Sequence, residues 1–202
     1  MMNSPRRLKG MLALLCLLGG VSAVVGYRVY LYPHGRRPGG VSLPGVYGAL
    51  LTYAQEHNGW FPDSDQGQYR ALQLLYNEYC PSGRELAGVS GNPDRTADAL
   101  RSGTALSSNL SSWVYVPGLR SDDPGALAIL WDSKPGLYHD GRRNSFGGRA
   151  VLFASGSISN VPAMDWDRFE RKQRELRLEL QSKRATMSGE RLLRPHRDEQ
   201  RK

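Results

Sequence analysis

The stretch that decides the fold is "RAVLFASGSISNV", residues 149–161, in which two short apolar runs flank a Ser-Gly-Ser sequence. Each run has the length and the residue types of a β-strand. The glycine supplies the backbone freedom of a tight turn, and a serine can hydrogen-bond to the turn's own backbone. The sequence therefore predicts a β-hairpin with a structural turn at Ser155, Gly156 and Ser157.

Two more apolar runs precede this hairpin, at residues 113–116 and 126–131, and Gly, Pro, Asp and Asn bound them. The hairpin itself supplies strands over 149–153 and 157–161. Because no helical pattern separates the four strands, we expect a small antiparallel sheet.

Helical patterns come before the strands. Val46, Leu50, Tyr53 and Ala54 recur at helical spacing, and Asn58-Gly59 supplies a stop signal. A second amphipathic helix is predicted by Tyr69, Leu72, Leu75, Tyr76 and Tyr79, and it ends at Pro81. Residues 82–111 are rich in Gly, Ser, Asn and Asp, which indicates a long loop with at most one helical turn near 96–100.

A charged helix is predicted over residues 164–185, after the strands. Acidic residues crowd its start, where they favour a helix. Its apolar stripe is narrow and has a polar break: Trp166, Phe169, Gln173, Leu176 and Leu180. Two interpretations remain open, a surface helix whose first turn docks through Trp166 and Phe169, or a partner-binding or oligomerising helix. Residues 186–202 are polar and basic, and we expect them to be disordered.

The N-terminal part predicts a membrane segment. Residues 1–9 are basic, and the 18 residues from 10 to 27 carry no charge. Together with the tyrosine-rich residues up to 32 they are long enough for a signal-anchor helix, with a cytoplasmic N-terminus and an exported C-terminal domain at the inner membrane. The alternative is a cleaved signal peptide, because Val21-Ser22-Ala23 has the small residues that signal peptidase needs. A Pro/Gly linker over 33–45 and an exported domain over 46–163 follow.

Charge is concentrated at the two ends of the 202-residue chain. The net charge is +8, yet residues 10–167 sum to −1. A nucleic-acid-binding domain needs a basic face, so we expect a membrane and other envelope proteins as partners, and no nucleic acid. Cys16 lies in the apolar segment and Cys80 in the domain, which predicts a free thiol at Cys80 rather than a disulfide.

No catalytic pattern stands out, and we expect no enzyme activity. The four histidines lack metal-ligand spacing, and neither "FASGS" nor "RNSFGG" matches the nucleophile elbow of hydrolases. The only metal candidates are carboxylates that could hold calcium, Asp63 and Asp65 with Asp122 or Asp123. A loop that caps a helix explains the first two equally well. We therefore expect no cofactor, with calcium as the one possible ion.

In order along the chain, "LLTYAQEHNGWFPD", "YNEYCPSG", "WVYVPG", "ILWDSKPGLYHDGRRN" and "AVLFASGSISNV" resemble the exported domains of bacterial pseudopilins of type II secretion and their prepilin-type relatives. The residues that carry the resemblance are Tyr53, Gly59, Pro62, Cys80, Pro81, His139, Gly141 and Asn144, with Ser155 in place of an Asp in the family's D-G-S turn. The resemblance covers residues 46–162. It implies a pilin-like α+β fold and a non-enzymatic role in a secretion or envelope assembly.

Two features depart from the family pattern. Leu15 stands where a processed pseudopilin has Glu at the fifth mature position, if the leader ends at Gly10. The linker over 33–45 interrupts the long helix that pseudopilins pack into a filament. The sequence thus predicts a membrane-tethered relative or minor component that acts by protein–protein contact. The alternatives are a cleaved, soluble exported binding protein that uses the loop from His139 to Asn144, and, less favoured, an exported hydrolase.

Overall fold

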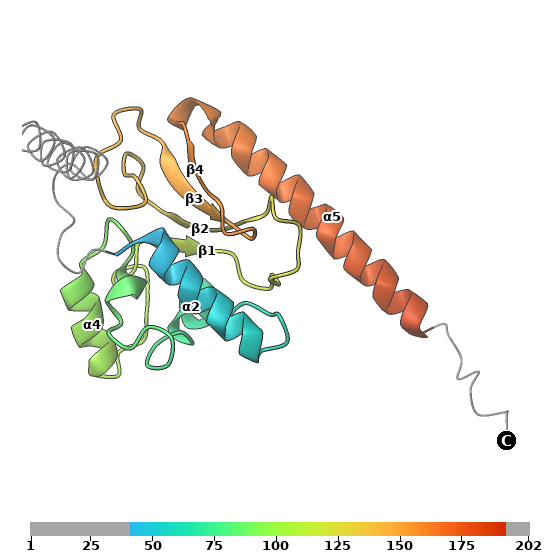
Figure 1. The fold of residues 1–202 in the computed structure, drawn as a ribbon, viewed down its shortest axis with the longest axis horizontal. Coiled ribbons are helices and arrows are strands. Elements are labelled where there is room, and N and C mark those ends of the chain that lie inside the picture. Colours follow the sequence, from blue (N-terminus) through green and yellow to red (C-terminus); the bar gives the residue numbers. More distant parts are fainter. Residues whose placement is uncertain (1–40, 193–202) are drawn as a thin grey trace, which may run out of the picture. The chain divides into compact units, whose positions relative to one another are not determined.

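The computed structural model describes residues 41–192, with side chains up to 186, and shows an α+β domain around one four-stranded sheet (Figure 1). The strands are β1 (Trp113–Tyr115), β2 (Ala128–Asp132), β3 (Arg149–Phe153) and β4 (Ile158–Val161). They are all antiparallel and lie in the order in which they occur in the chain. The predicted sheet is therefore confirmed. The expected signal-anchor helix over 10–32 lies outside the described residues, and within 41–192 no helix is long and apolar enough to cross a membrane.

Helix α2 (Leu43–Glu56) precedes the sheet and buries Val46, Leu50 and Ala54, as the spacing predicts. Asn58 and Gly59, both with positive φ, follow its end. The helix begins three residues before the predicted domain boundary at 46, and Leu43 is completely buried. Proline at the second helical position explains this start, because its missing N–H is not needed in the first turn of a helix.

The segment between α2 and the sheet differs from the prediction in two places: the helix after Gln68 is shorter, and the expected loop over 82–111 contains helices. The second helix, α3 (Gln68–Gln73), has six residues, and its expected second half is replaced by i→i−3 turns at 74–76 and by Asn77 with a positive φ of 72°. The expected long loop contains the short 3₁₀ helix η1 (Arg84–Ala87) and the nine-residue α4 (Pro93–Arg101). Asn92 caps α4 by accepting a hydrogen bond from Arg95 N at 3.1 Å, and proline at its first position favours a helix start.

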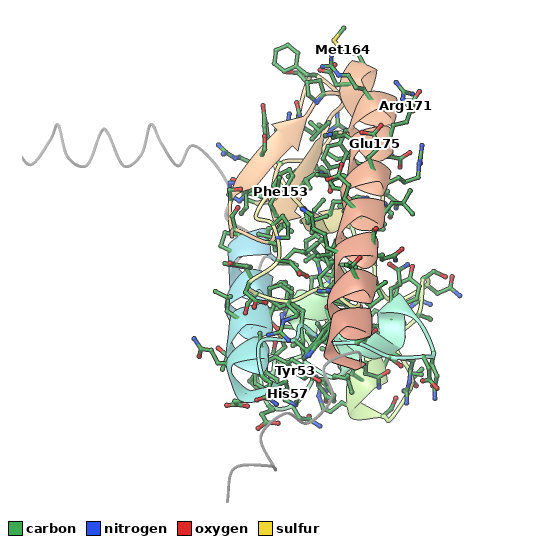
Figure 2. All side chains as sticks on the ribbon, turned by 90° about the vertical axis from the view of Figure 1, so that its right-hand side faces the viewer. Tyr53, His57, Phe153, Met164, Arg171 and Glu175 are labelled. Carbon is green, nitrogen blue, oxygen red and sulfur yellow. The ribbon has the colours of Figure 1, made fainter. Side chains whose placement is uncertain are left out.

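The sheet is covered on both faces. Since side chains alternate across a strand, Leu130 and Leu152, which are paired in the register, share one face. Both belong to the core cluster that contains Val46 and Leu50 of α2. Their neighbours Trp131 and Phe153 point to the other face. In both views α2 and α5 lie on different sides of the strands, and Figure 2 shows Phe153 between them.

Helix α5 (Trp166–Leu192) follows the 3₁₀ turn η2 (Ala163–Asp165) and lies along the second face. Its first turn docks as predicted: Trp166 packs edge-on against Trp131, with ring centroids 6.1 Å apart, and Phe169 against Phe153 at 6.2 Å. The helix continues to Leu192, beyond the predicted end at 185 and into the segment that we expected to be disordered.

The polar break in the α5 stripe is its most buried residue. Gln173 is only 5% exposed, and its side-chain amide accepts a hydrogen bond from Ala128 N at 2.8 Å and donates one to Ala126 O at 3.0 Å. The amide therefore bonds to the backbone at the start of β2 as a neighbouring strand would. A side chain that interrupts the stripe in the sequence holds the helix on the sheet.

The turn from β3 to β4 contains Ser155, Gly156 and Ser157. Gly156 has φ of +80°, and a Cβ atom there would lie 2.4 Å from Cε1 of Tyr47, so both conformation and space require glycine. The Tyr47 hydroxyl donates to Ala154 O at 3.2 Å, which seats the start of α2 against the turn. The Oγ atoms of Ser155 and Ser157 are 2.8 Å apart on the surface. The three residues thus have structural contacts only.

We expect Gln173→Met to lower the free energy of unfolding by about 1–3 kcal/mol, because methionine keeps the shape but leaves the buried N–H of Ala128 and the C=O of Ala126 without their partner. Urea unfolding monitored by tryptophan fluorescence measures this loss. The matched control is Gln181→Met on the exposed side of the same helix, which should change the stability by less than about 0.5 kcal/mol. Equal losses in the two variants would contradict a bridging role for Gln173.

At the turn, Gly156→Val should cost at least about 2 kcal/mol, since valine meets both a disfavoured φ and the Tyr47 ring. Ser155→Ala removes only a surface hydroxyl contact and should cost under about 1 kcal/mol. Thermal unfolding of the two variants side by side tests the difference. Equal melting temperatures would show that the glycine is dispensable.

Candidate functional site

Two of the residues that carry the resemblance lie at the end of α2. The Tyr53 ring stacks on His57, with centroids 3.7 Å apart and planes within 3°, and contacts Tyr79 edge-on at 5.4 Å. Gly59 has φ of +85°, and its N–H donates to Ala54 O at 2.8 Å, which ends the helix. Tyr79 donates a hydrogen bond to Glu56, and this bond raises the pKa of Tyr79 to about 12. Figure 2 shows Tyr53 and His57 together at one end of the domain.

The loop after α2 is fixed to the sheet through Pro62. Its carbonyl oxygen accepts a hydrogen bond from the buried Tyr115 hydroxyl of β1 at 2.7 Å. Burial raises the pKa of Tyr115 well above its ordinary value. One step back, Phe61 N donates to Leu119 O at 3.0 Å, which joins this loop to the loop that follows β1. The contacts at Pro62 are therefore those of a structural joint.

The two pairs of calcium candidates lie in these two joined loops. A Cβ atom on Gly118 would lie 3.7 Å from Oδ2 of Asp63, so Asp63 reaches the second loop. Asp63 and Asp65 are both exposed on the surface. Among residues 41–192 no group of three or more His, Cys, Asp or Glu side chains could hold a metal ion.

The second pair of carboxylates, Asp122 and Asp123, forms ion pairs with arginine side chains. Arg120 Nε donates to Asp122 at 2.8 Å, and this contact lowers the pKa of Asp122. Arg184 of α5 contacts both carboxylate oxygens of Asp123, at 2.8 and 2.6 Å, and also donates to Gly118 O at 2.9 Å. The positive charge that a cation would bring to these two carboxylates is thus supplied by guanidinium groups.

The same two arginines both lie over the ring of Trp60, an arrangement that no sequence pattern indicates. The Cζ atoms of Arg120 and Arg184 are each 5.0 Å from its ring centroid. A cation within about 6 Å of an indole ring is attracted to its π face, so the ring holds each guanidinium group in place. The cluster of Trp60, Arg120, Asp123 and Arg184, which we call the arginine clamp, fastens α5 to both loops. Arg184 was missed because a cation near the end of a charged helix usually points into solvent.

Asp132, at the end of β2, is a second buried carboxylate that sequence reasoning missed. It is 5% exposed and accepts hydrogen bonds from Ser90 N (2.8 Å), Ser90 Oγ (2.6 Å), Ser112 Oγ (2.6 Å) and Lys134 N (2.9 Å). Four donors compensate the charge, so the site needs no cation. Beside it lies a hollow of about 250 Å³ that Ser90, Ser112 and Lys134 help to line, together with Arg95.

The loop that contains His139, Gly141 and Asn144 connects β2 to β3. Asn144 is buried; its Nδ2 donates to Oδ1 of Asn160 in β4 at 2.8 Å, and its Oδ1 accepts from Phe146 N at 3.0 Å. Gly141 takes φ of +84°. No group among the described residues hydrogen-bonds to the buried Nδ1 of His139, and the neighbouring Asp140 instead pairs with Arg142. Asn144 therefore fixes the loop, whereas none of the described side chains orients His139 through this nitrogen as the partner of a catalytic base would.

Cys80 is buried, and the turn from Cys80 to Gly83 contains Pro81. The N–H of Cys80 donates to Leu75 O at 2.8 Å, and its carbonyl accepts from Gly83 N at 2.9 Å. The thiol is free, and burial raises its pKa to about 12. Pro81 itself is exposed. This part of the motif shapes the chain and presents no reactive thiolate at neutral pH.

The residues singled out from the sequence thus fall into five places: the end of α2 with its loop, the Cys80 turn, the loop after β1 that contains Asp122 and Asp123, the loop from β2 to β3, and the β3–β4 turn. The structure does not gather them into one cavity. Comparison of the chain with protein-family models, with curated proteins and with solved structures finds no match.

The buried thiol yields a pH prediction. The folded state keeps the Cys80 proton up to about pH 12, whereas an unfolded thiol loses it near pH 8.5. The stabilising contribution is therefore complete below about pH 8.5 and falls by up to about 1.4 kcal/mol per pH unit above it. From about pH 8 to pH 10 the wild type should lose up to about 2 kcal/mol more than Cys80→Ala.

Alkylation tests the same point independently. Peptide mapping after treatment with iodoacetamide should show Cys80 unmodified in the folded protein at about pH 8 and modified in urea. Rapid modification of Cys80 in the folded state, or identical pH dependence of wild type and Cys80→Ala, would contradict a buried, protonated thiol.

Proposed function

We propose that this chain is a membrane-anchored, non-enzymatic relative of the pseudopilins that acts by protein–protein contact in a type II secretion or other envelope assembly. The anchor is the segment 10–32, with the N-terminus in the cytoplasm and the domain exported. We also propose that the α+β fold of the domain is pilin-like.

The observation that carries the proposal is where the motif residues lie in the fold. The residues at the end of α2 close the helix and fix its loop to β1, and Asn144 ties the loop before β3 to β4. The turn at Gly156 receives Tyr47 from α2. Residues that carry the resemblance thus form the joints between one helix and an antiparallel meander. This supports a shared architecture over separate chance matches.

The surface of α5 supports contact with other proteins. It is the longest helix among the described residues, and only one side of it is held, by Trp166, Gln173 and the arginine clamp. Arg171 and Glu175 on the opposite side are exposed, and Figure 2 shows them on the helix. A rigid helix with a charged outer side offers a partner a long and specific surface.

A second candidate is a cleaved, soluble exported binding protein that uses the loop between β2 and β3. The observation that favours it is the buried Nδ1 of His139 without a partner, since such atoms in native proteins call for an explanation. A small ligand that bonds to this nitrogen would supply one.

The two candidates differ in the mature N-terminus. N-terminal sequencing of the protein from a bacterial membrane fraction should find Met1 for an unprocessed anchor or Met11 for pseudopilin-type processing, and either supports the proposal. A start at Val24 in a soluble fraction would overturn it in favour of the cleaved protein.

A variant in the anchor provides the matched test. Leu17→Arg places a charge in the middle of the apolar segment at a cost of about 3 kcal/mol, whereas Leu17→Ile keeps the segment apolar. Wild type and Leu17→Ile should stay in the membrane pellet after alkaline extraction, and Leu17→Arg should leave it. Alkaline phosphatase fused after residue 192 should be active only in the first two. An inactive wild-type fusion would contradict export of the domain.

A further inference from the structure

Strand β4 is the open edge of the sheet. Phe153 N donates to Ser157 O at 3.0 Å, and this bond fixes the phase of the β3–β4 ladder. Since bonded and non-bonded pairs alternate in an antiparallel ladder, Ser159 turns its backbone groups toward β3, whereas Ile158 and Asn160 turn theirs outward. Nothing among residues 41–192 hydrogen-bonds to the outward N–H and C=O groups of these two residues.

The opposite edge, β1, is closed by the protein's own side chains. Its outward N–H groups belong to Trp113 and Tyr115, which donate to Ser111 Oγ at 3.3 Å and Gln68 Oε1 at 2.8 Å. Natural edges are usually protected by such contacts or by charged side chains. β4 has neither: its sequence is Ile-Ser-Asn-Val.

Two exposed apolar side chains lie at the end of this open edge. Phe146 is 76% exposed and Met164 is 89% exposed. The turn that carries Phe146 is tied to β4 through Asn144 and Asn160, and a Cβ atom on Gly147 would lie 3.7 Å from Cβ of Ala163. Figure 2 shows Met164 projecting from the start of α5. Exposed apolar groups beside unpaired backbone mark an interaction surface.

We propose that β4 pairs antiparallel with β4 of a second copy of this chain, about a two-fold axis at Ser159, so that two four-stranded sheets become one. With this axis, Ile158 of each copy lies opposite Asn160 of the other. The four hydrogen bonds of these two pairs use all of the outward groups. The two Ser159 residues form the close, non-hydrogen-bonded pair, where Cα atoms approach to about 4.5 Å and a small side chain fits.

The strand suits its own copy for two reasons. A symmetric pair sets identical side chains near each other, and β4 carries no charge that would repel its twin. The same register brings residue 162 of one copy opposite residue 156 of the other. Phe146 and Met164 of each copy then lie next to the partner's β3–β4 turn, where they can be covered.

The test uses the full-length chain in detergent and a substitution at an exposed position. Ser159→Lys places two ammonium groups at the axis, and Ser159→Thr keeps the site uncharged. Sedimentation over a range of concentrations should show dimers for wild type and Ser159→Thr. Ser159→Lys should bind its copy at least about tenfold more weakly, and its melting temperature should equal that of the wild type at concentrations where both are monomers.

Disulfide trapping checks the register in a Cys16→Ser background. Two cysteines at position 159 would have Cα atoms about 4.5 Å apart, within the range that a disulfide spans. Ser159→Cys should therefore form a covalent dimer on mild oxidation. Ser182→Cys, which is exposed on α5, should not.

Any other outcome overturns the proposal. A dimer that is insensitive to Ser159→Lys and gives no disulfide at 159 uses another surface. If the chain is a monomer and the Ile158 and Asn160 amides exchange rapidly with solvent, the edge is unpaired and open to a different protein. If the chain is a monomer and these amides exchange slowly, another part of the same chain covers the edge. Because Ser159→Lys leaves residues 10–32 unchanged, self-association through the proposed membrane anchor would survive this substitution, whereas self-association at β4 would not.

Discussion

The hydrogen bonds between the Gln173 side chain and the backbone at the start of β2 set the position of α5 on the sheet. The register of β2 and β3 shifts between Ala128 and Leu130, so the N–H of Ala128 needs a partner outside the sheet. A side-chain amide can supply a donor and an acceptor at once, as a neighbouring strand does. Because this contact is buried, it aligns the aromatic docking at one end of the helix with the arginine clamp at the other.

Where hydrophobic periodicity and turn residues decide the structure, the sequence was sufficient to predict the elements. The meander, the face of α2 and the docking of Trp166 follow from alternation, helical spacing and turn residues. In place of the second half of the predicted helix after Gln68 the chain forms tight turns and a positive φ at Asn77, which no apolar pattern reveals. Helix α4 was underestimated although Asn92 and Pro93 form a start signal, because few apolar residues follow them.

The candidate site was harder to predict because its charges are matched by residues that are far away in the sequence. Asp123 and Arg184 are 61 positions apart, and Asp132 takes its donors from Ser90 and Ser112. In the sequence, paired aspartates look the same whether a metal or an arginine compensates them. The residues that carry the resemblance were informative in another way, since several of them join elements of the fold.

The two edge strands of the sheet differ in how their outward backbone groups are satisfied. At β1, Gln68 and Ser111 satisfy backbone groups from inside the fold, next to the buried Tyr115. At β4, the only side-chain hydrogen bond within the part of the chain that the structure describes is the one from Asn144 to Asn160, which holds the neighbouring loop and leaves the strand's outward backbone groups open. A strand whose inner ladder and loops are already fixed can accept a further strand without rearranging. Because the strand is already ordered in the domain, association at this edge loses little conformational entropy.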